Sequence, residues 1–272
     1  MKPGRLWALA ALLLFALARP PTPPRWRVYA LQWGLSEHFG SRELLRGAPP
    51  GELRPLAWLA WLIRGPDRSI LVDTGVLDPD EAFERGVSGF VPITTLLDRV
   101  HVAPQDITDI ILTHTHWDHT GGLSAFPQAR LWVQQRELDW APSVASAGPP
   151  VRAEDIQEIE RRVAALPSPV DGDAEVAPGV LCHLGGHHTP GTQWVEIRTG
   201  EQTIVLASDE AYLYANIEEH RATGATSDPA ASLREYELMT RTASSAYLVV
   251  PGHDPQVMQR FTRVEKGVVE LR

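Results

Sequence analysis

The chain has 272 residues, 43% of them hydrophobic, and a formal net charge of −9 at pH 7. This length is enough for one large core, and an acidic balance without a basic stripe excludes nucleic acid as a default partner. The single cysteine, Cys182, excludes an internal disulfide and a thiolate-rich metal site. Its apolar neighbours Val180 and Leu181 indicate a small buried core residue rather than a nucleophile.

Residues 1–18 have the pattern of a secretory signal peptide. Lys2 and Arg5 give it a positive start, residues 6–17 form an uncharged apolar run of 12, and Ala16-Leu17-Ala18 is a small-x-small cleavage site. The run is too short to span a bilayer comfortably, and an uncleaved membrane anchor stays open as the alternative. We therefore expect a periplasmic or secreted protein, with a Pro-rich linker at 19–25 and one hydrolase domain at 26–272.

The first half of this domain alternates strands with less regular segments. Apolar, β-branched runs predict strands at 26–31, 56–63, 69–72 and 107–112. Residues 33–50 hold turn residues, and within them 37–40 are candidates to overhang a pocket. Residues 76–103 read as a lid-like insert with one short helical piece near 94–100.

The second half repeats the theme of strands that run into polar residues. Strands are predicted at 129–133, 179–184, 193–198, 203–207, 247–250, 261–264 and 268–271, and helices near 134–140, 153–165, 216–220 and 228–242. Asp228 and Pro229 suit the cap and first position of the last helix. No internal sequence repeat accompanies this arrangement.

A cluster of metal-ligand residues follows the strand at 107–112. His114, His116, Asp118 and His119 lie within six residues, before a Gly-Gly turn. Neutral imidazole nitrogens and carboxylate oxygens are zinc-type ligands. His114 and His116 alternate along an extended segment and can share one metal, while Asp118 and His119 lie past the bend and can reach a second.

Three more ligand candidates, His188, Asp209 and His253, also follow apolar strands. The full set of five His and two Asp suits two zinc-like ions, with three neutral nitrogens for one, Asp118 and two His for the other, and a shared carboxylate. Such a pair of ions lowers the pKa of bound water from about 15.7 towards about 7, which provides a nucleophile without serine or cysteine.

The order His-x-His-x-Asp-His, Gly-His-His-Thr-Pro-Gly, Ser-Asp and Pro-Gly-His, preceded by Leu-Val-Asp-Thr-Gly at 71–75, resembles the metallo-β-lactamase superfamily over residues 26–272. The resemblance implies an α/β fold, a four-layer αββα sandwich with the metal site at one edge. It assigns His114, His116 and His188 to a first metal, Asp118, His119 and His253 to a second, and Asp209 as the bridge. His188 is chosen over His187 because it directly precedes Thr-Pro-Gly, and the role of His187 stays open.

Within that superfamily the chain is similar to the dinuclear N-acyl-homoserine lactonases, which place a tyrosine three residues after the bridging aspartate. Tyr212 stands at that position. The resemblance implies that a metal-bridging hydroxide attacks a lactone carbonyl, that the Tyr212 phenol stabilises the oxyanion, and that Asp118 or Asp209 moves the proton. A packed aromatic is the alternative role for Tyr212.

The expected partners are therefore two divalent metal ions, zinc by ligand type, and a small-molecule ester or lactone. Four aromatic residues are candidates for lining an apolar acyl pocket: Trp33, Phe83, Phe90 and Trp117. The alternative functions are an exported β-lactamase acting on cyclic amides, and a thioesterase of the same superfamily. A redox diiron protein fits less well, because His116 stands where such proteins carry an acidic residue. The sequence indicates no oligomeric state.

Overall fold

The computed structural model describes residues 25–146, 148, 150–165 and 169–272. The predicted signal peptide at 1–18, and the predicted linker up to residue 24, lie outside the described residues. Among the helices that the structure describes, none combines the length and apolar character needed to cross a membrane.

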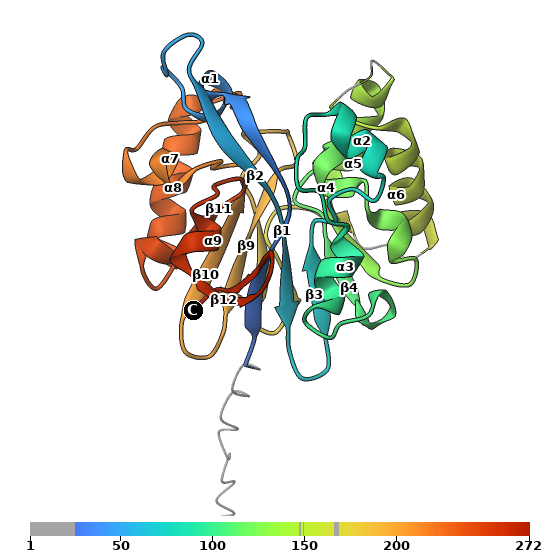
Figure 1. Ribbon diagram of the computed structural model, residues 1–272. Coiled ribbons are helices and arrows are strands. Elements are labelled where there is room, and N and C mark those ends of the chain that lie inside the picture. The colour runs from blue at the N-terminus through green and yellow to red at the C-terminus, as the bar shows by residue number, and fades with distance from the viewer. Residues whose placement is uncertain (1–24, 147, 149, 166–168) are drawn as a thin grey trace, which may run out of the picture.

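Two β-sheets form the centre of the molecule (Figure 1). The larger has eight strands in the order β12-β13-β1-β2-β3-β4-β5-β6, and the smaller has five in the order β11-β10-β9-β8-β7. The strands of the larger sheet are β1 Arg27–Gly40, β2 Leu53–Arg64, β3 Ser69–Val72, β4 Asp109–Ile111, β5 Arg130–Gln134, β6 Pro169–Val170, β12 Thr262–Glu265 and β13 Val268–Glu270. Those of the smaller are β7 Ala174–Ala177, β8 Val180–Leu184, β9 Gln193–Arg198, β10 Thr203–Ser208 and β11 Val249–Pro251.

Helices cover the outer faces of both sheets. In Figure 1 the green helices α2 to α6 lie on one side and the orange helices α7 and α8 on the other. The helices are α1 Ser41–Leu44, α2 Pro79–Glu84, α3 Ile93–Asp98, α4 Trp117–Thr120, α5 Gln135–Ala145, α6 Ala153–Ala165, α7 Tyr214–Glu218, α8 Pro229–Thr242 and α9 Val257–Arg260, with short 3-10 turns at Pro104–Asp106, Leu123–Ala125 and Ala246–Leu248. This is the four-layer αββα sandwich, so the predicted fold class is confirmed.

Strand β2 contributes side chains to two separate hydrophobic cores, one on each face. Its residues 56–63 are buried throughout, because both faces of the strand are covered. Trp61 and Ile63 pack between the two sheets, whereas Leu62 points to the other side, among the helices of the first layer. Cys182 is free and lies in the core between the sheets, as its apolar neighbours predict.

The structure corrects two element predictions in the first half. Residues 33–40 are not a turn region, because β1 continues to Gly40 and pairs with β2 through register shifts after Gln32 and after Ser36. These irregularities break the period-two pattern from which a strand is predicted. The insert at 76–103 also contains a second helix, α2, capped by the Asp78 carboxylate and begun by Pro79.

Candidate metal centre

The predicted ligands follow four different strands, and the fold brings these strand ends together. His114 and His116 lie just after β4, and the short helix α4 carries Asp118 and His119. His188, Asp209 and His253 lie beyond the ends of β8, β10 and β11. Because β3, β4 and β5 are parallel, as are β10 and β11, the carboxyl ends of the central strands open to one edge of the sandwich.

Side chains from these segments form two groups that could each hold a metal ion. Within each group the ligand atoms all lie within 4.8 Å of one another. The first group is His114, His116, His188 and Asp209, and the second is Asp118, His119 and His253. His187 is in neither group; its backbone N–H donates to Glu210 instead.

Asp209 lies between the two groups with one carboxylate oxygen toward each. Its Oδ1 is 2.9 Å from His253 Nε2 and 3.4 Å from His119 Nε2. Its Oδ2 is 3.4 Å from His188 Nε2 and 3.7 Å from His114 Nε2. A carboxylate oriented in this way is the arrangement that a pair of neighbouring cations requires of a shared ligand.

The protein fixes the far sides of two of these imidazoles. His119 Nδ1 lies 2.8 Å from the Asp73 carboxylate, and His253 Nδ1 lies 2.9 Å from the carbonyl oxygen of Ala57. Asp73 also accepts hydrogen bonds from the backbone and hydroxyl of Thr113. Partners of this kind orient imidazole ligands and leave the opposite nitrogen, Nε2, pointing into the site.

The inward-facing nitrogens fit metal ions. The Nε2 atom of His114 is buried and makes no hydrogen bond with any described residue. A buried nitrogen without a partner costs free energy, and coordination by its lone pair removes that cost. Nitrogen and carboxylate donors without thiolate are the set that zinc accepts.

Burial and mutual repulsion hold several of these imidazoles in the neutral, ligating form. Burial, with the neighbouring His188, lowers the pKa of His116 to about 3, and burial likewise lowers the pKa values of His114 and His188. Burial opposes ionisation of Asp209, but the surrounding imidazoles, His253 first, outweigh it and hold its pKa well below the usual range. Three of the imidazoles are therefore neutral beside an ionised carboxylate, whereas at His119 and His253 the neighbouring carboxylates outweigh burial and raise the imidazole pKa.

Glu137, on α5, is a residue that sequence reasoning missed. Its buried carboxylate accepts hydrogen bonds at Oε1 from the Thr115 N–H and hydroxyl, at 2.9 and 2.7 Å, and at Oε2 from the Thr189 hydroxyl and the Gly191 N–H, at 2.8 and 3.0 Å. It thereby ties the loop that carries His114 and His116 to the loop that carries His188. No local pattern marks it, since an acidic residue in the first turn of a helix is ordinary.

We expect Glu137→Gln to weaken metal retention by about 10–100-fold, because the amide replaces one of two acceptor oxygens with a donor that faces N–H and O–H groups. Competition of the purified variant with a chromogenic chelator measures this affinity. Glu160→Gln, on an exposed position of α6, is the matched control and should bind metal like the unmodified chain. Equal affinities for the two variants would refute the positioning role of Glu137.

A cavity of about 480 Å³ opens over the two groups. Its polar wall comes from five of the ligands together with Tyr212, Glu43 and Arg85. Its apolar wall is formed by Phe39, Leu44, Leu56, Trp58 and Trp117. Phe39 confirms that the segment at 37–40 overhangs a pocket. Trp117 lines the cavity as predicted, but the predictions for Trp33 and Phe90 are wrong, since neither lines it. Trp33 lies behind this wall, 5.5 Å from Trp58 between ring centroids, and Phe90 packs on Trp33. The prediction for Phe83 is wrong: its side chain is 80% exposed and lines no part of this cavity.

Tyr212 faces the cavity beside both groups of ligands. Its hydroxyl lies 3.5 Å from His188 Nδ1, and its ring centroid is 5.3 Å from that of His253. Burial, followed by the charges of Asp209 and Asp118, raises the pKa of this phenol well above its ordinary value. The hydroxyl therefore keeps its proton at neutral pH and is available as a donor.

A family model described as the metallo-beta-lactamase superfamily matches residues 54–253. This chain belongs to the metallo-beta-lactamase superfamily. The superfamily resemblance of its sequence is thus confirmed, and with it the expectation of a metal-dependent hydrolase.

Within the superfamily, the chain is similar to N-acyl homoserine lactonases. An N-acyl homoserine lactonase of Bacillus sp is 33% identical over 188 residues, covering 62% of this chain and 70% of that protein. The crystal structure of a quorum-quenching N-acyl homoserine lactone lactonase superposes with a TM-score of 0.71 at 26% identity, covering 89% of this chain and 98% of that one. An N-acyl homoserine lactone hydrolase with N-hexanoyl-L-homoserine at its catalytic metal centre gives a TM-score of 0.69 at 25% identity, covering 88% and 97%.

Proposed function

We propose that this chain hydrolyses the ring ester of N-acyl-homoserine-lactone-like substrates, using two divalent metal ions, zinc by ligand type. The observation that carries the proposal is Asp209, whose two oxygens face two separate ligand groups, with Tyr212 alongside. The product found at the metal centre of one related hydrolase supports the substrate class.

When bound, the two ions would supply a hydroxide nucleophile at neutral pH. The chain supplies the rest. His114, His116 and His188 would hold one ion, Asp118, His119 and His253 the other, and Asp209 both. The apolar wall of the cavity orients the acyl chain and excludes water from one side of the substrate.

Two side chains are placed to act on the reacting atoms. The neutral Tyr212 hydroxyl donates a hydrogen bond to the carbonyl oxygen as negative charge develops there. Asp118 or Asp209 returns the proton to the leaving ring oxygen. Asp118 lines the cavity, and its Oδ2 lies 3.0 Å from His119 Nε2. A new bond from oxygen to the carbonyl carbon forms, the ring C–O bond breaks, and a carboxylate and an alcohol result.

The proposal is tested by assaying the metal-loaded full chain on N-hexanoyl-homoserine lactone, with acid release followed by titration, and on the β-lactam nitrocefin. We expect rapid acid release from the lactone and slow turnover of nitrocefin. Faster hydrolysis of nitrocefin would favour the β-lactamase alternative and overturn the lactonase proposal. Thioester hydrolysis without lactone hydrolysis would overturn it in favour of a thioesterase.

Tyr212→Phe is expected to lower kcat on the lactone by about 100-fold, because one donor to the developing oxyanion is lost. Steady-state kinetics and metal analysis of the same preparation measure the effect, and the metal content should stay unchanged. Tyr247→Phe, which changes an exposed tyrosine that does not line the cavity, is the control. A Tyr212→Phe enzyme with full kcat would assign Tyr212 to packing alone.

The N-terminal sequence pattern supports export, and we propose that the chain acts in the periplasm or outside the cell after cleavage beyond Ala18. Mass spectrometry of the protein from fractionated cells tests this. A mature chain lacking residues 1–18 is expected. A full-length chain in the membrane fraction would instead indicate an anchor, and a full-length chain in the cytoplasm would contradict export.

A further inference from the structure

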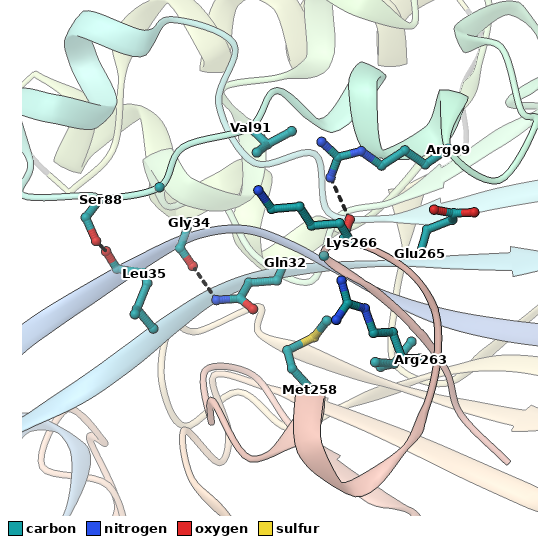
Figure 2. Close-up of a pocket in the computed structure, with 13 residues that line it drawn as sticks. Gln32, Gly34, Leu35, Ser88, Val91, Arg99, Met258, Arg263, Glu265 and Lys266 are labelled. Atoms are coloured by element: carbon teal, nitrogen blue, oxygen red, sulfur yellow. Dashed lines mark hydrogen bonds between the residues drawn. The ribbon is translucent and has the colours of Figure 1, made fainter.

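A second cavity lies away from the metal centre, at the edge of strand β1. It has a volume of about 410 Å³ and shares no lining residue with the cavity over the metal ligands. Its wall combines β1, the loop at 88–91, α3, α9 and the hairpin of β12 and β13 (Figure 2). We call it the β1-edge cavity. Nothing in the proposed lactonase mechanism uses it.

The cavity exists because β1 changes partners there. The hairpin of β12 and β13 ends where the Gly267 carbonyl accepts a hydrogen bond from the Gln32 N–H at 2.9 Å. Farther along β1, Leu35 pairs with Ser88 through two backbone hydrogen bonds of 3.0 and 2.7 Å. Between these two contacts β1 shifts register and carries Gly34, whose backbone lies too close to Val87 and Trp58 for a side chain.

Three positively charged side chains line this cavity: Arg99, Arg263 and Lys266. The Arg99 guanidinium donates to the Lys266 carbonyl at 2.6 Å, which holds it at the turn of the hairpin. Within the described part of the chain, none of the three cations has a carboxylate oxygen within 4.0 Å; Arg99 makes its bond to a backbone carbonyl. Glu265 also lines the cavity, yet Figure 2 shows its carboxylate apart from the Lys266 ammonium.

Such a cluster is unexpected in a chain with a net charge of −9. Gathered cations repel one another, and a bound anion relieves that repulsion with charge-assisted hydrogen bonds. The other half of the wall is apolar: Leu35, Val91 and Met258 are partly buried, and Val269 is buried. The cavity is thus polar and cationic on one side and apolar on the other.

We propose that the β1-edge cavity binds a small organic anion, a carboxylate that carries a short apolar chain. The carboxylate would lie among Arg99, Arg263 and Lys266, and the chain would lie on Leu35, Val91 and Met258. The volume, the charge and the apolar wall of the cavity all favour an organic carboxylate. A neutral molecule would leave the cations unpaired, and an inorganic anion would leave the apolar wall exposed to water.

Methionine methyl groups give a local readout for the test. The full chain has three methionines, of which Met258 lines the cavity and Met239, on α8, is fully buried. With ¹³C-methyl methionine, NMR titration with sodium octanoate should shift the Met258 signal saturably and leave Met239 in place. Octanamide, the neutral analogue, and inorganic phosphate should each bind at least tenfold more weakly.

Variants decide whether the cations are responsible. The double variant Arg263→Gln with Lys266→Gln, both on exposed positions, should weaken octanoate binding at least tenfold and leave the Met239 signal unchanged. Arg161→Gln, an exposed arginine paired with Glu158 on α6, is the matched control and should bind like the unmodified chain. Equal affinity for octanoate and octanamide, equal affinity of the double variant, or the absence of any Met258 shift would each overturn the proposal.

Discussion

Asp209→Asn is expected to lower lactone turnover by on the order of a thousandfold, the largest effect of any single conservative change in this protein. The Asp209 carboxylate presents an oxygen to each ligand group, at 2.9 Å from His253 and 3.4 Å from His188. Asparagine keeps one acceptor and turns an N–H donor toward the other group. It also removes the negative charge that the neutral imidazoles cannot supply.

This prediction is measured as kcat and as metal ions per chain in the same preparation. Asp171→Asn, at an exposed position near β7, serves as the matched control and should retain full activity. Retention of more than a tenth of the activity by Asp209→Asn, with both metals bound, would mean that the carboxylate does not join the two groups functionally.

Removal of the metal ions is expected to lower the Tm by about 8–16 °C. Two ions, each present at about thirty times its Kd, contribute about 2 kcal/mol each and about 4 kcal/mol together to the free energy of unfolding, and 1 kcal/mol corresponds to about 2–4 °C for a chain of this size. The ions stabilise the fold because they neutralise buried carboxylates: those of Asp73, Asp118 and Asp209 all lie next to His119. Without cations, their burial is compensated only by protons.

Differential scanning calorimetry before and after dialysis against a chelator measures this shift. Re-addition of zinc should restore both the Tm and lactone hydrolysis. A Tm that stays the same after the metal has demonstrably been removed would show that the site folds equally well without its ions, and that the buried carboxylates are balanced in another way.

Much of the site could be predicted because its signal is local. His114, His116, Asp118 and His119 lie in six consecutive residues, and His188, Asp209 and His253 each follow an apolar strand next to turn residues. The ends of neighbouring strands in a layered sheet lie at one edge, so polar residues that follow strands in the sequence are expected to lie close together in space. The structure brings these side chains together in two groups.

What could not be predicted depends on contacts between distant segments. Glu137 joins loops 22 and 52 residues away in sequence, and nothing in its own neighbourhood indicates this. Phe83 is an aromatic residue of the kind that lines apolar pockets, but its side chain projects into solvent, because α2 buries only Ala82 among its residues. Likewise, the net charge of −9 conceals the local gathering of cations at the β1-edge cavity.

The central claim is that seven side chains from separate strand ends hold a pair of metal ions. The most direct test is elemental analysis of the full chain, purified without chelator, against its concentration by amino-acid analysis. We expect two transition-metal ions per chain, zinc predominating, and about one per chain for a variant that loses the ligands of one group, such as His116→Ala with His188→Ala. A native protein with no bound transition metal would contradict this claim.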